Sequence, residues 1–90
     1  MRTKKGYALR SLGNESLLVP MSLGEAVDFT RMISLNASAA FLWKEVEDKE
    51  FDAETLANLL MEGYGIDHDT AQHDVEALLQ SWENAGIIIN

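Results

Sequence analysis

The chain has 90 residues, a formal net charge of −8 and no cysteine. This length predicts a single domain over residues 1–90, with residues 1–5 flexible and a modest core, because such a chain buries only about 60–65% of its unfolded surface. Without cysteine, neither disulfides nor a thiolate zinc site can support that core. The N-terminus lacks the apolar segment of a secretory signal, and no apolar run approaches the ~20 residues that span a bilayer, so we expect a cytoplasmic protein.

Charge is divided unevenly along the chain. Residues 1–31 carry five Lys and Arg against three acids, whereas residues 32–90 carry two Lys against twelve acids. Phosphate backbones are bound through clustered Lys and Arg, so the C-terminal two thirds should repel nucleic acid. The acidic part favours a partner surface with Lys or Arg through electrostatic steering, although the charge also serves simply to keep a small protein in solution.

The first third of the chain predicts three β-strands. Residues 6–20 are expected to form a hairpin, with Gly13-Asn14 at its turn and Pro20 closing its second strand. Residues 27–35 alternate between apolar and polar side chains, which predicts a third strand with one half-buried face. In a sheet of three strands two are edges, and we expect the third strand to be one of them.

Three helices are predicted to follow. The first begins at Asn36, whose side-chain oxygen can accept an amide hydrogen bond as an N-cap. The second runs from Asp52 to about Gly63, and the third is capped by Asp67 or Asp69 and ends before Gly86. The apolar faces are carried by Ala39, Leu42, Trp43 and Val46 in the first helix and by Ala71, Val75, Leu78, Leu79 and Trp82 in the third. The order βββααα defines an α+β fold, with a three-stranded antiparallel sheet packed on three helices.

Two stretches of this sequence resemble the PqqD family. Ile33-x-Leu35-Asn36-x-x-Ala39-Ala40-x-Leu42-Trp43-x-x-Val46 is similar to that family's junction between the third strand and the first helix. Its last helix and tail resemble Tyr64-Gly65-Ile66-Asp67 followed by Asp74-Val75-x-x-Leu78-Leu79-x-x-Trp82-x-x-Ala85-Gly86-Ile87-Ile88. Leu17-Leu18-Val19-Pro20 fits as well, so the resemblance covers roughly residues 6–90.

The resemblance implies a small winged helix-turn-helix-like domain that is not an enzyme and holds no cofactor. Proteins of this family, also known as RiPP recognition elements, bind the leader of a ribosomally made precursor peptide and present it to a modifying enzyme, often a radical SAM protein of the SPASM type. The leader adds as an extra strand beside the third strand, in a groove walled by the third helix.

The resemblance implies that the leader-binding residues lie on the third strand and the third helix. The third helix has one flank of short side chains, Asp74, Ala77 and Ser81, which would let a peptide approach closely; an ordinary solvent boundary is the alternative interpretation. The full set of expected binding residues comprises Asp28, Phe29, Thr30, Arg31, Met32 and Ile33 of the strand and Asp74, Ala77, Leu78 and Ser81 of the helix.

Other functions remain open from the residues alone. A winged-helix DNA-binding regulator would use residues 68–85 as its recognition helix, but that segment has four acids and no Lys or Arg. An oligomerising interaction module is a third class, because an unpaired strand edge can pair with a second copy to form a homodimer. His68 and His73 lie about 140° apart on a helix, so we expect no metal site, and no constellation of side chains predicts catalysis.

Overall fold

The structure, a computed structural model, describes residues 1–20 and 32–89. Its main sheet is antiparallel, with strand order β2-β3-β4, and consists of β2 (Tyr7–Leu12), β3 (Glu15–Pro20) and β4 (Ile33–Leu35). Gly13 takes a φ of +62° at the first central position of the two-residue β2–β3 turn, a conformation that favours glycine. The predicted hairpin is therefore confirmed. The predicted third strand is confirmed over Ile33–Leu35, whereas Met32 lies just outside the strand and residues 27–31 lie outside the described part.

A second, two-stranded sheet joins the two ends of the described chain. In it β1 (Arg2–Thr3) pairs antiparallel with β5 (Ile88–Ile89). The Lys4 amide donates to the Ile87 carbonyl at 2.8 Å, and the Thr3 side chain is buried and accepts a hydrogen bond from the Asp48 amide. Residues 1–5, for which flexibility remains a prediction, thus include the paired strand β1, although the segment has no periodicity of its own.

The three helices follow the predicted order, and each begins at a capping side chain. Asn36 accepts the Ala39 amide at 2.8 Å at the start of α1 (Ala37–Val46). Asp52 caps α2 (Ala53–Tyr64), and Asp67, rather than Asp69, caps α3 (His68–Ala85). Gly65 and Gly86 end α2 and α3 in the left-handed region. The α+β architecture is as predicted.

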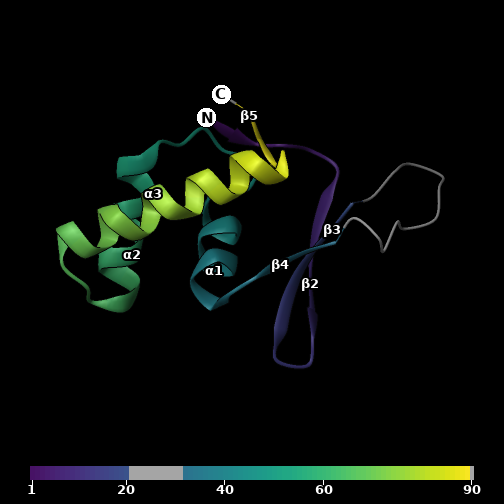
Figure 1. The fold of residues 1–90 in the computed structure, drawn as a ribbon, viewed down its shortest axis with the longest axis horizontal. Coiled ribbons are helices and arrows are strands. Elements are labelled where there is room, and N and C mark those ends of the chain that lie inside the picture. Colours follow the sequence, from purple (N-terminus) through teal and green to yellow (C-terminus); the bar gives the residue numbers. More distant parts are fainter. Residues whose placement is uncertain (21–31, 90) are drawn as a thin grey trace.

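The core lies where α3 crosses the other two helices and β3 and β4 approach them (Figure 1). Its largest fully buried side chains are Trp43, Trp82, Leu18, Leu42, Leu56, Ile87 and Val75. Trp43 of α1 and Trp82 of α3 meet in the middle of this set, so one aromatic contact joins the helix after β4 to the last helix. In the described ranges no helix is long and apolar enough to cross a membrane.

Candidate functional site

β4 lies at one end of the sheet, so one of its edges faces away from β3 among the residues that the structure describes. The strand register shows which backbone groups point to that edge. A two-residue hairpin turn closes on a hydrogen-bonded pair, here Leu12 and Glu15, and such pairs alternate along an antiparallel ladder. The alternation turns the Leu18 backbone toward β4, where Leu18 is opposite Ile33. The N–H and C=O of Ser34 therefore point outward, to the open edge.

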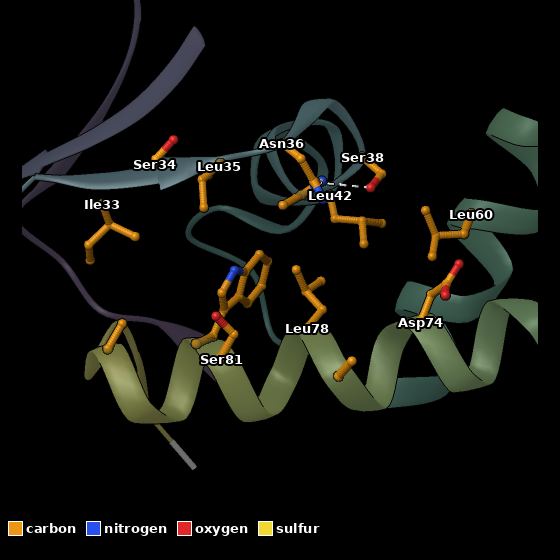
Figure 2. A pocket seen from close by; sticks show the side chains of 14 residues that line it. Ile33, Ser34, Leu35, Asn36, Ser38, Leu42, Leu60, Asp74, Leu78 and Ser81 are labelled. Atoms are coloured by element: carbon orange, nitrogen blue, oxygen red, sulfur yellow. Dashed lines mark hydrogen bonds between the residues drawn. The ribbon is translucent and has the colours of Figure 1, made fainter.

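The side chains of β4 divide between its two faces. Ile33 and Leu35 point toward α3, whereas Ser34 points away from it (Figure 2). Leu35 is buried in the core and Ile33 is half-buried. Within residues 1–20 and 32–89, β4 thus presents backbone groups without a strand partner along its edge, beside an apolar face that is directed at α3.

A groove of about 430 Å³ runs between β4, the start of α1 and α3 (Figure 2). Its apolar surface comes from Ile33, Leu35, Ala39, Leu42, Leu60, Leu78 and Trp82. Its polar groups belong to Ser34, Asn36, Ser38, Asp74 and Ser81, while Ala77 and Ala85 add short side chains on α3. A strand added to the β4 edge would therefore lie over apolar side chains and beside a helix face with little bulk.

Five of the expected binding residues line this one groove: Ile33, Asp74, Ala77, Leu78 and Ser81. Met32 is half-buried directly before β4 and does not line the groove. The remaining four, Asp28, Phe29, Thr30 and Arg31, lie outside the described residues.

Nine residues that line the groove are absent from the expected binding set, and four of them are Asn36, Ser38, Leu42 and Leu60. The first two follow β4 directly, and the Ser38 hydroxyl donates to Asn36 Oδ1 at 3.1 Å. Their position next to the expected strand was a signal for them. Leu60 comes from α2 and reaches the groove only through the packing of three helices, for which no local pattern exists.

Asp74 is the one ionisable residue among the described residues that line the groove. It is exposed, and no Lys or Arg in the described ranges lies within ion-pair distance of it. Trp82 also lines the groove, and its buried indole Nε1–H has no hydrogen-bond partner in the described part of the chain. The groove therefore offers apolar surface, backbone hydrogen-bonding groups at its edge and one negative charge.

A second hollow, of about 420 Å³, lies beside β1. Arg2, Lys4 and Lys5 line it together with Glu47 and Asp48, so opposite charges lie close together there. It does not adjoin the open β4 edge. No group of three or more His, Asp or Glu side chains in the described part of the chain is arranged to hold a metal ion.

An antiparallel sheet followed by three helices, with a groove between its last strand and its last helix, is the architecture that the sequence resemblance led us to expect. Residues 15–88 match the family described as "Coenzyme PQQ synthesis protein D (PqqD)". The chain belongs to the PqqD family.

Among solved structures the chain is similar to "TbiB1 in Complex with the TbiA(beta) Leader Peptide". The TM-score is 0.70 at 17% sequence identity, and the match covers 97% of this chain and 93% of the other. At this identity the likeness establishes the fold. No curated protein sequence matches the chain significantly.

Proposed function

We propose that this protein is a non-catalytic peptide-binding adaptor. It captures the leader of a ribosomally made precursor peptide by strand addition to β4 and presents it to a modifying enzyme of the radical SAM class. The observation that carries the proposal is the outward-facing backbone of Ser34, at a strand edge that no other described strand covers and that borders an apolar groove. An exposed edge with a side-chain groove beside it is what recognition by strand addition requires.

The expected binding free energies indicate how much affinity the strand edge can supply and how much must come from the groove. Ser34, and Met32 two residues before it, each direct one N–H and one C=O to the edge if the strand geometry continues. Four hydrogen bonds at ~0.5–1.5 kcal/mol each amount to a few kcal/mol before the entropy of ordering the peptide is subtracted. Micromolar binding corresponds to about −8 kcal/mol, so burial of leader side chains in the groove must supply the rest.

The family and the fold support this assignment. The chain belongs to the PqqD family, and the similar structure of TbiB1 was solved with a leader peptide. A DNA-binding role is disfavoured by α3, which carries Asp69, Asp74, Glu76 and Glu83 and no Lys or Arg. Such a helix in a major groove would be repelled by the phosphates.

The test uses a substitution that blocks the edge without breaking the sheet. Because the Ser34 N–H points away from β3, Ser34→Pro removes a donor from the open edge and leaves the β3–β4 ladder intact. Ser34→Ala is the matched control, since it keeps the backbone N–H. Unfolding by urea verifies that both variants fold.

Candidate ligands for the test are selected from a phage-displayed library of random peptides of roughly twelve residues. We expect enriched peptides to bind wild type and Ser34→Ala alike in calorimetry and to bind Ser34→Pro at least about tenfold more weakly. The proposal is overturned if no peptide is enriched, or if folded Ser34→Pro binds the enriched peptides as well as wild type does. Light scattering with and without peptide distinguishes strand addition from pairing of β4 edges between two copies. A dimer that pairs through the β4 edge should dissociate when peptide binds, whereas a dimer that persists with bound peptide does not use this edge.

A further inference from the structure

We propose that the leader captured by this groove carries a Lys or Arg that pairs with Asp74, two or four residues away from an apolar side chain that packs beside Ile33 and Ser81. This inference rests on the proposed function and adds the class of peptide that the groove selects. It is carried by the distribution of polar and apolar groups along the groove.

The groove has two chemically different ends (Figure 2). At one end Ile33 and Leu35 of β4 lie opposite Ser81 of α3. At the other end Asp74 lies near Leu60, on the side of the groove where α1 begins. A peptide that pairs with the β4 edge and continues along the groove therefore passes from an apolar end to an end with a carboxylate.

The helix sets the spacing between the two contacts. Asp74 and Ser81 are seven residues apart in α3, which corresponds to about 10 Å along a helix that rises ~1.5 Å per residue. An extended peptide covers this distance in about three residues at ~3.3 Å each. Side chains on one face of a strand recur every second residue, so the two contacting residues are separated by two or four positions.

Lys and Arg fit this end of the groove better than any other residue type. Their aliphatic stems can lie along Leu60 and Leu78 while the charged head reaches Asp74. Among the residues that the structure describes, none that lines the groove is a Lys or Arg that would receive a leader carboxylate. The surrounding field has the same sign, because residues 32–90 hold twelve acids and two Lys, so a leader acid at this position would be repelled.

The test repeats the peptide selection on charge variants of α3. Asp74→Asn keeps the shape of the side chain and removes its charge, and Asp74→Lys reverses the charge. Glu76→Gln is the matched control, since Glu76 is an exposed acid of the same helix that does not line the groove. Asp74 is exposed, so all three variants should unfold at the wild-type urea concentration.

We expect peptides selected on wild type to share a Lys or Arg at a fixed position relative to an apolar residue. Asp74→Asn should weaken their binding about three- to fivefold and Asp74→Lys more than about tenfold, with both losses reduced at high salt, whereas Glu76→Gln should change it less than about twofold. Selection on Asp74→Lys should enrich Asp or Glu at the same position.

The outcomes separate this inference from the proposed function. Peptides that lose binding to Ser34→Pro but share no basic position overturn the inference and leave the proposed function standing. A shared basic position that is equally sensitive to Glu76→Gln and Asp74→Asn overturns the assignment to Asp74. Failure to enrich any peptide sensitive to Ser34→Pro overturns both.

Discussion

Trp43 and Trp82 meet edge to face, with ring centroids 5.4 Å apart and ring planes at 84°. Both are 1% exposed, and they connect the helix that follows β4 to the helix that forms the opposite wall of the groove. The separation of the two groove walls is therefore fixed in the core rather than at the surface. Edge-to-face aromatic pairs contribute ~0.5–1.5 kcal/mol beyond the area that they bury.

Truncation of this pair should be costly. Trp43→Ala is expected to lower the free energy of unfolding by about 3–5 kcal/mol, which for a domain of this size is a large share of its stability. Trp43→Phe should lose clearly less, because it keeps an aromatic ring and removes an indole N–H for which no described residue provides a hydrogen-bond partner. Urea unfolding followed by circular dichroism measures both. Equal losses for the two variants would show that ring packing between α1 and α3 does not govern stability.

The N-cap of α1 gives a second prediction. Asn36→Ala should lower the free energy of unfolding by about 1 kcal/mol, because the Ala39 amide loses its 2.8 Å hydrogen bond. Asn36→Asp should remain within a few tenths of a kcal/mol of wild type, since Asp is an equally good cap. Because Asn36 also lines the groove, peptide affinity should be measured on both variants. Loss of affinity in the stable Asp variant would identify a direct contact rather than a loosened strand.

Two other caps predict how stability depends on pH. The backbone N–H and hydroxyl of Thr55 lower the pKa of Asp52 below its ordinary value of 3.8. The hydroxyl and N–H of Thr70 lower the pKa of Asp67 in the same way. A carboxyl whose pKa is lower in the folded state contributes stability at pH values above its unfolded pKa and loses that contribution as the pH falls through the folded pKa. Wild type should thus become less stable as the pH falls below about 4.

Asn at both positions tests the origin of this loss. Asp52→Asn with Asp67→Asn keeps an oxygen acceptor for each cap but removes the two titrating groups. Thermal unfolding measured from neutral pH to pH 3 should therefore show a shallower decline for the double variant than for wild type. Parallel declines would mean that other carboxylates, such as Glu50 in its 2.9 Å ion pair with Arg2, dominate the acid response.

The short side chains on α3 predict a steric block. Ala77→Arg places a long side chain in the groove and should weaken binding of the selected peptides by more than about tenfold. Gln72→Arg adds the same side chain to α3 at an exposed position that does not line the groove, and should leave affinity within about twofold. Calorimetry on the two variants makes the comparison. Unchanged affinity for Ala77→Arg would mean that peptides bind elsewhere.

Local signals explain which parts of the fold were predictable. Asn36, Asp52 and Asp67 mark helix starts through their own side chains, and the alternation that ends at Leu35 marks a strand whatever it pairs with. β1 and β5 have two residues each, too few for any period, and exist because each is the other's partner. Their pairing is a property of the assembled chain, and the sequence pattern alone contains no trace of it.

The residues that line the groove also fall into a set that the sequence predicts and a set that it does not. The α3 flank of Asp74, Ala77 and Ser81 follows from the helical period once the core face is known, and all three line the groove. Leu60 lies in the apolar face of α2 and lines the groove because α2 packs on α3. The spacing of residues in the sequence does not predict this packing. Periodicity thus identifies one wall of a site, while the residues that complete it depend on tertiary packing.

The junction between β4 and α1 also limits where an added strand can end. The Asn36 carbonyl accepts the Ala40 amide at 2.9 Å as the first hydrogen bond of α1, so the ladder of available acceptors stops at Ser34. A peptide that binds by the proposed strand addition should therefore end its pairing at this corner and should not slide past it by two residues. On the proposed function, Asn36 would fix the register of the bound leader, and the number of residues between the bound segment and a residue to be modified would be set from this position.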